Sequence, residues 1–125
     1  MTENELATIV VDLCIKIHKT LGPGLLESVY ESALCYELSK LNIPFERQKA
    51  ISVLYEDTVL DVGFRADVIV EDKLIIELKS IDSFTNVHHK ILITYLKLSG
   101  KKLGLLINFN VNLLKDGICR KVNKL

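Results

Sequence analysis

The sequence predicts one α/β domain over residues 1–125, with a mixed β-sheet flanked by helices in the order α-α-β-β-β-α-β. Two N-terminal stretches repeat apolar residues at helical spacing, and three extended apolar runs follow them. A third helical stretch then separates the last of these runs from a further apolar run. Two strands joined through a helix can lie parallel by a right-handed crossover, which makes the sheet mixed.

Composition indicates an ordinary globular domain. Hydrophobic residues make up 49% of the 125 residues and charged residues 26%, as in a chain with a packed core. The polar start, and the charges inside the first apolar stretch, lead us to expect no signal peptide and no transmembrane segment. Cys14, Cys35 and Cys119 are far apart and form no CxxC pattern. We therefore expect reduced thiols in a cytoplasmic protein, and neither a disulfide framework nor a zinc site.

The formal net charge is zero, which gives no support for nucleic-acid binding by itself, but the charges are unevenly distributed. Residues 1–96 carry 9 Lys or Arg and 15 Asp or Glu, a sum of −6. Residues 97–125 carry 7 Lys or Arg and a single Asp, a sum of +6. A basic end of this kind could lie along a phosphate backbone, or it could be a solvated lysine-rich surface.

The first two predicted helices cover Thr2 to Leu21 and Leu25 to Leu41. Thr2 and Glu5 fit a capping box, and Gly22-Pro23-Gly24 separates the helices. One stripe of the second helix begins with an acid, Glu27, and is otherwise aromatic or aliphatic, which aims a carboxylate at the core. Alternatively, Glu27 is the third residue after an N-cap at Gly24 and caps the helix. The residues of this stripe are Glu27, Tyr30, Leu34, Leu38 and Leu41.

Two strands are predicted over Phe45–Glu56 and Val59–Val70, with Gly63 a bulge in the second. Arg47 and Gln48, at the polar start of the first, could line a groove or could be the solvated end of an edge strand.

The next strand, Leu74 to Ser80, contains Glu77 and Lys79 on one face of an apolar run. Burying a charge in such a run is costly unless it is paired or binds a metal. If Val70 pairs with Leu74 across a three-residue loop, Asp67 falls opposite Glu77; a two-residue loop would send Asp67 to the other face. The three-residue loop therefore predicts two carboxylates and a lysine on one face, which suits a divalent-metal site.

A third helix is predicted over Val87–Ser99, a buried strand over Leu103–Phe109, and a loop with a short polar strand or tail after it. His88, in the first turn of the helix, could bind phosphate or a metal, or it could face solvent.

Asp67 followed after nine residues by Glu77-Leu78-Lys79 resembles the active-site signature of the PD-(D/E)XK nuclease superfamily. The element order resembles that superfamily's restriction-endonuclease-like core. Gly24-Leu-Leu-Glu27-Ser-Val-Tyr30 resembles the motif that names its GxxExxY family, and the resemblance runs over nearly the whole chain.

The resemblance implies a role for each matching residue. Asp67 and Glu77 would bind Mg²⁺, or Mn²⁺ as a substitute, with the carbonyl group of Leu78 as a further ligand. Lys79 would position the attacking water or offset the charge that develops on the phosphate. Glu27 would complete the acidic cluster, as a helix glutamate does in resolvase-like nucleases. The implied function is metal-dependent hydrolysis of phosphodiester bonds in nucleic acid, with DNA the expected substrate and a homodimer conceivable by analogy with resolvases. Residues expected to contact the substrate are Tyr30, Arg47, Gln48, His88 and Tyr95.

Ala66 precedes Asp67 where the superfamily name has a proline, which is common in the branch that this chain resembles. Two other positions depart from the family pattern. Ile91 stands where the helix after the strand often presents a glutamine to the site, and Thr94 stands where an asparagine is expected. A second hypothesis is therefore a nuclease-fold module that binds nucleic acid or a protein partner without cutting it. A third takes the charged residues as surface ion pairs of little energetic weight.

Overall fold

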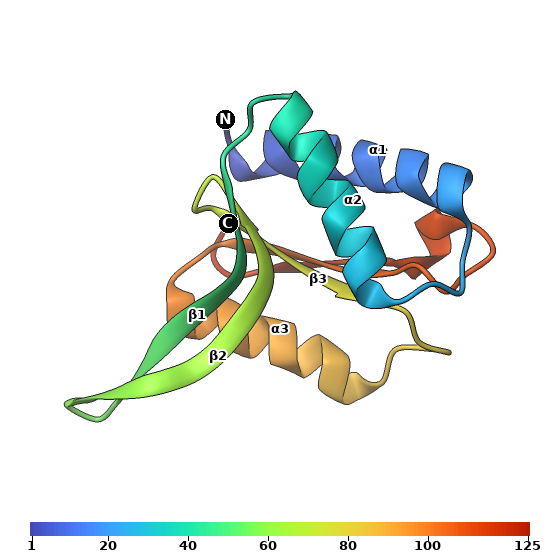
Figure 1. Ribbon diagram of the computed structural model, residues 1–125. Coiled ribbons are helices and arrows are strands. Elements are labelled where there is room, and N and C mark those ends of the chain that lie inside the picture. The colour runs from blue at the N-terminus through green and yellow to red at the C-terminus, as the bar shows by residue number, and fades with distance from the viewer.

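The computed structural model describes residues 1–125, apart from the side chain of Val62 (Figure 1). The predicted α/β class and element order are confirmed, and the polar C-terminal stretch does form a fifth strand. The elements are α1 (Glu3–Leu21), α2 (Glu27–Lys40), β1 (Phe45–Tyr55), β2 (Thr58–Val70), β3 (Leu74–Lys79), α3 (Asn86–Ser99), β4 (Leu103–Asn108), the 3-10 helix η1 (Leu114–Gly117) and β5 (Ile118–Val122).

The five strands form one sheet in the order β1-β2-β3-β4-β5. β3 and β4 are parallel, as the intervening helix predicts, and every other neighbouring pair is antiparallel. β3 and β4 are buried along nearly their whole length, because helices cover both faces of the sheet at its centre.

Two hydrophobic cores lie on opposite faces of the sheet. α1 and α2 cover one face and α3 covers the other (Figure 1). The core under α1 and α2 includes Leu6, Val10, Cys14, Tyr30, Leu34, Leu38, Val68, Val70, Ile76 and Leu78. The core under α3 includes Phe64, Ala66, Ile69, Ile75, Leu92, Leu96 and Leu106.

The two N-terminal helices begin differently. The predicted capping box at α1 is confirmed, because the Thr2 hydroxyl accepts from the Glu5 amide and the Glu5 carboxylate accepts from the Thr2 amide. α2 has Leu26 as its N-cap, with no side-chain cap.

Among the described residues, no helix is both long and apolar enough to cross a membrane.

β1 and β2 form a long, twisted hairpin that extends beyond the rest of the sheet (Figure 1). Its register shifts between Ile51 and Val53, opposite the segment that contains Gly63. The predicted bulge at Gly63 is therefore confirmed. A Cβ atom there would lie 2.8 Å from the carbonyl oxygen of Ile51 and would clash with Val53, so only glycine fits without movement.

The alternation of side chains along β2 reverses at Asp67, so that residues of the same parity point to one core before it and to the other core after it. Phe64 and Ala66 belong to the α3 core, whereas Val68 and Val70 belong to the α1–α2 core. Side chains two residues apart on a regular strand share a face, so the alternation reverses between residues 66 and 68. This irregularity places Asp67 where the sheet is locally distorted.

Candidate functional site

Asp67 and Glu77 meet where β2 and β3 stop pairing in a regular way. The pairs Val70–Leu74, Ile69–Ile75 and Val68–Ile76 confirm the three-residue loop. Beyond them, side chains replace backbone pairing: the Asp67 amide donates to Oε2 of Glu77 at 2.8 Å, and the Leu78 amide donates to Oδ2 of Asp67 at 2.9 Å. The two carboxylates therefore occupy the point at which the strands separate, as the register predicts.

The two carboxyl groups lie together at some electrostatic cost, with Glu77 buried and Asp67 half-buried. Burial, followed by the negative charge of Asp67, raises the pKa of Glu77 to about 8. Burial also raises the pKa of Asp67, against the lowering effect of its bond to Leu78 and of the Lys79 charge. Glu77 is only 6% exposed. Ionising both groups is therefore unfavourable here, and the positive charge of Lys79 offsets that cost only in part.

Lys79 is half-buried at the end of β3 and acts electrostatically on both carboxylates, lowering the pKa of each. Among the described side chains, none forms an ion pair with Lys79. Its ammonium group is therefore available to a ligand at the site.

Glu27 reaches the same end of β3 from α2. It is the first residue of that helix, so the alternative that makes it the third residue and a cap is wrong. Its Oε2 accepts a hydrogen bond of 3.1 Å from the amide of Ser80, the residue after Lys79. A surface hollow of about 570 Å³ opens here. The residues that line it are Gly24, Leu25, Leu26, Glu27, Ser28, Ser80 and Asn110.

Tyr30 has no exposed surface, which corrects the expectation that it contacts substrate. Its ring stacks on Phe109 with 4.2 Å between centroids. Its hydroxyl donates to the Gly22 carbonyl oxygen at 2.6 Å and accepts from the Leu25 amide at 3.1 Å. Tyr30 thus fixes the loop that leads into Glu27.

Sequence reasoning missed Glu31, a third acid that lies near the site. It is 7% exposed, and its negative charge raises the pKa of both Asp67 and Glu77. Its two oxygens accept from Nε of Arg47 and from Nε2 of Gln48, each at 2.6 Å. Glu31 follows Glu27 by four residues, one helical turn, and this spacing was the available signal.

These contacts revise the expected roles of Arg47 and Gln48. Both side chains are committed to Glu31, and Arg47 also donates to the Ser32 hydroxyl at 2.8 Å. Gln48 additionally approaches Oδ1 of Asp67 at 3.4 Å. In this structure they connect α2 with β1 and β2 while both residues remain exposed, so their contact with a substrate stays a prediction.

Two residues of α3, Tyr95 and His88, are expected to contact the substrate, and Tyr95 is the one that lies near the carboxylates. Burial, followed by the charges of Glu77 and Asp67, raises the pKa of Tyr95, whose ring stacks on Phe64 with 4.0 Å between centroids. His88 instead completes the start of α3: its Nδ1 accepts from the Thr85 amide at 2.9 Å.

The carboxylates at the site form a small donor set for a divalent ion. Within the described residues, no group of three or more His, Cys, Asp or Glu side chains is arranged to hold one. Mg²⁺, however, is commonly bound by one or two carboxylates and completes its shell with water and substrate oxygens. Asp67 and Glu77, which lie together and repel each other when ionised, provide the two carboxylates of that smaller requirement.

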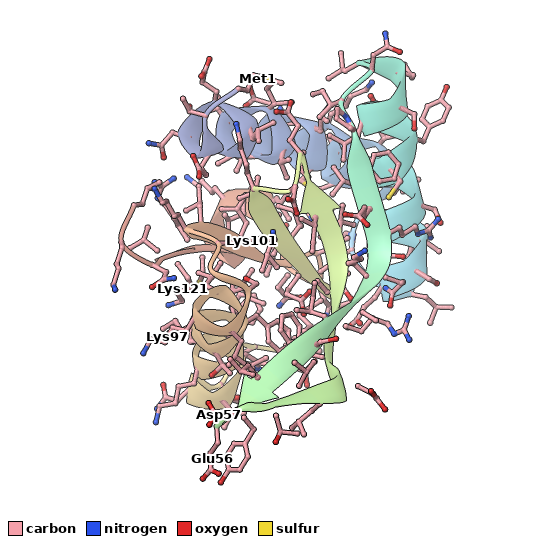
Figure 2. All side chains as sticks on the ribbon, turned by 90° about the vertical axis from the view of Figure 1, so that its left-hand side faces the viewer. Met1, Glu56, Asp57, Lys97, Lys101 and Lys121 are labelled. Carbon is pink, nitrogen blue, oxygen red and sulfur yellow. The ribbon has the colours of Figure 1, made fainter. Side chains whose placement is uncertain are left out.

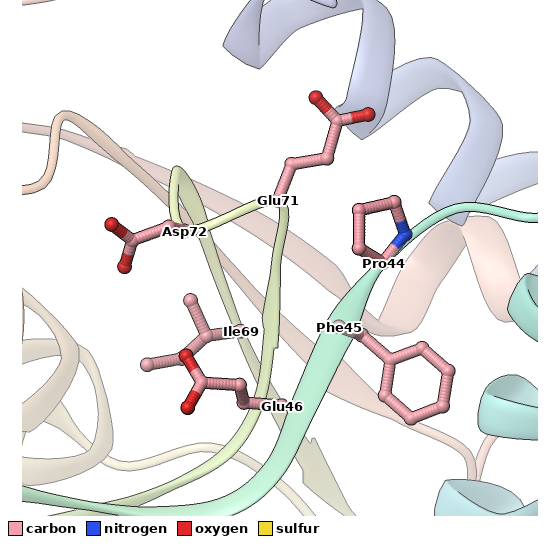
Figure 3. Close-up of a pocket in the computed structure, with 6 residues that line it drawn as sticks. All are labelled: Pro44, Phe45, Glu46, Ile69, Glu71 and Asp72. Atoms are coloured by element: carbon pink, nitrogen blue, oxygen red, sulfur yellow. The ribbon is translucent and has the colours of Figure 1, made fainter.

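A separate acidic hollow of about 400 Å³, at the start of β1, has no comparable chemistry (Figure 3). Its carboxylates are already in ion pairs: Glu46 with Lys49 and Asp72 with Lys101, both at 2.8 Å, and Glu71 with the N-terminal amine at 3.4 Å. The lining residues are Pro44, Phe45, Glu46, Ile69, Glu71 and Asp72.

Comparison with known proteins gives one family and one similar structure. A model of the PD-(D/E)XK nuclease superfamily matches residues 4–121. The crystal structure of SSO0001 is similar, with a TM-score of 0.48 and 23% sequence identity over 76% of this chain. This chain spans 48% of that one, or about half its length. No curated protein matches the sequence significantly.

Proposed function

We propose that this chain, which belongs to the PD-(D/E)XK nuclease superfamily, hydrolyses phosphodiester bonds in nucleic acid, with DNA as the substrate. The observation that supports this most directly is the Asp67–Glu77 pair, with Glu77 buried and Asp67 half-buried, at the point where β2 and β3 separate. Lys79 lies beside the pair and is not engaged by a carboxylate of the described chain. Two acids that can hold a divalent ion, with an ammonium group beside them, suit metal-assisted phosphodiester hydrolysis.

Each residue has a distinct part in the proposed mechanism. Asp67 and Glu77 would hold Mg²⁺, or Mn²⁺ in its place, with the Leu78 carbonyl group and Glu27 as further ligands. The bound ion would supply positive charge to the phosphate and lower the pKa of the attacking water. Lys79 would orient that water or offset the charge that builds up on the phosphate oxygens.

The substrate would enter beside Glu27. The hollow of about 570 Å³ at this residue also includes Ser80, the residue next to Lys79. Tyr95 approaches the carboxylates from α3, so its hydroxyl is a candidate substrate contact. His88, in the first turn of α3, would contact the substrate only if it gave up its bond to Thr85.

The test is metal-dependent cleavage of labelled DNA in Mg²⁺, in Mn²⁺ and in EDTA. Glu77→Ala and Lys79→Ala should each abolish product formation in Mg²⁺ and leave the circular dichroism spectrum unchanged. Lys19→Ala, which removes an exposed lysine near the end of α1, is the matched control and should cleave normally. Cleavage that survives both site substitutions would refute the mechanism.

A non-cleaving binding module is the second candidate, and Ile91 favours it. Ile91 occupies the position where this fold often presents a glutamine, and its side chain is 39% exposed on α3. An aliphatic group there cannot donate a hydrogen bond to a phosphate or a water. In this case labelled DNA would be retarded on a gel, and no product would form at any metal concentration.

A further inference from the structure

Gln48 has an unusual backbone conformation for a residue inside a strand. Its φ is +51°, in the left-handed region that non-glycine residues rarely adopt. Of the six non-glycine residues described with positive φ, it alone lies within a helix or strand. Such outliers persist when the surrounding structure determines them, and they concentrate at functional sites.

The outlier lies directly across from Asp67. Arg47 pairs with Val68 and Lys49 with Ala66, so Gln48 and Asp67 face each other between these pairs, and the described ladder gives them no pairing of their own. β1 also changes face here, because Phe45 contacts the α1–α2 core whereas residues 51 and 53 contact the α3 core. β2 makes the same change at Asp67.

The polar groups of Gln48 that the structure pairs are held by α2 and β2. Its Nε2 donates to Glu31 of α2 at 2.6 Å and approaches Oδ1 of Asp67 at 3.4 Å. Its backbone carbonyl oxygen accepts from Nη1 of Arg65 at 3.0 Å. The buried Glu31 is in turn fixed by Arg47 at 2.6 Å. This arrangement connects a rigid helix to one oxygen of Asp67.

The other oxygen of Asp67 is held from the opposite side. Oδ2 accepts from the Leu78 amide at 2.9 Å, while the Asp67 amide donates to Glu77. Asp67 therefore has no regular backbone pair in either β1 or β3. Its carboxylate lies between the side-chain amide of Gln48 in β1 and the backbone amide of Leu78 in β3. Groups that fix a metal-binding carboxylate in this way usually tune its affinity.

We propose that Gln48 is a positioning residue for Asp67, anchored to α2 through Glu31. The left-handed backbone reverses the strand's alternation and brings the amide to the Asp67 carboxylate; the amide then sets the orientation in which Asp67 binds a divalent ion. This inference rests on the proposed function, because it takes Asp67 as a metal ligand.

The test separates the backbone of Gln48 from its amide. Gln48→Gly keeps the left-handed conformation without strain and removes the amide. We expect a Mn²⁺ affinity about 10-fold weaker, measured from the electron paramagnetic resonance signal of free Mn²⁺. In the melting temperature, relief of the backbone strain opposes the loss of the bond to Glu31. Gln48→Asn, which tolerates the same conformation but has a shorter side chain, should also bind Mn²⁺ more weakly. Asn42→Gly is the matched control, since Asn42 has a φ of +56° in the loop before β1, and it should leave the affinity unchanged.

The outcomes distinguish this inference from the proposed function. If wild-type protein binds Mn²⁺ no better than Asp67→Asn, the metal site is absent, and the proposed function and the inference both fail. If wild-type protein binds Mn²⁺ at Asp67 and Gln48→Gly binds it equally well, the inference alone is overturned. An equal loss of affinity in Asn42→Gly would likewise overturn it.

Discussion

At the residue scale, Glu77 makes stability depend on pH. Its pKa rises from 4.5 to about 8 on folding, first because of burial and then because of Asp67. Between these two values the folded chain holds a proton that the unfolded chain releases, so the free energy of unfolding falls as the pH rises from about 4.5 to 8. The slope from one such group is at most about 1.4 kcal/mol per pH unit. Urea denaturation at several pH values measures it.

Two additions sharpen this experiment. Glu77→Gln carries no titrating group and should flatten the curve over the same range. Mn²⁺ should stabilise the wild-type protein more at pH 8 than at pH 5, because the ion competes with the proton that Glu77 holds. A wild-type stability that rises steadily from pH 5 to pH 8 would contradict the assignment of this carboxyl group as buried and protonated.

Tyr30 gives a second prediction at this scale, one about stability and not about substrate. Tyr30→Phe keeps the stacking on Phe109 but removes the hydroxyl that bonds Gly22 and Leu25. Leaving their backbone groups without a partner should lower the free energy of unfolding by about 1–3 kcal/mol. Chemical denaturation of both proteins measures the difference. An unchanged stability would mean that water replaces the hydroxyl without cost.

At the element scale, Gly63 allows β1 and β2 to approach closely at the bulge in their hairpin. A Cβ atom at this position would lie 2.8 Å from the Ile51 carbonyl oxygen and would overlap Val53. Gly63→Ala should therefore destabilise the protein by about 1–3 kcal/mol, the usual range for overpacking. Amide exchange should quicken most in the hairpin between residues 51 and 64. Slow exchange and normal stability there would show that the bulge adapts freely.

The same elements show which parts of the fold and site could be predicted from sequence. Thr2 with Glu5 gave the start of α1, and the three residues between Val70 and Leu74 gave the register that opposes Asp67 and Glu77. These features depend on residues close in sequence. The contact of Glu31 with Gln48 joins residues 17 positions apart, and periodicity does not report side-chain hydrogen bonds between elements.

Two further features of the site, the backbone of Gln48 and the contacts of the Tyr30 hydroxyl, could not be predicted from the sequence. Nothing in the composition of β1 indicates that Gln48 takes a left-handed conformation, because glutamine rarely does so. The stripe position of Tyr30 predicted an inward side chain correctly, but it could not show that the hydroxyl binds the preceding loop.

At the scale of the whole molecule, the basic end gives the last prediction. Lys97, Lys101 and Lys121 lie on one face, with Glu56 and Asp57 at the tip of the hairpin on the same side (Figure 2). Lys101 is paired with Asp72, whereas Lys97 and Lys102 are exposed beside a hollow of about 460 Å³.

If this end contacts phosphates, Lys97→Ala with Lys102→Ala should weaken binding to DNA of any sequence. The slope of log affinity against log salt should become shallower by about 1–2, because each lost phosphate contact removes about 0.9. Lys19→Ala with Lys40→Ala removes the same charge from exposed positions on α1 and α2 and serves as the control in fluorescence anisotropy titrations. If both double variants lose affinity equally, the effect is one of net charge and the basic end makes no particular contact.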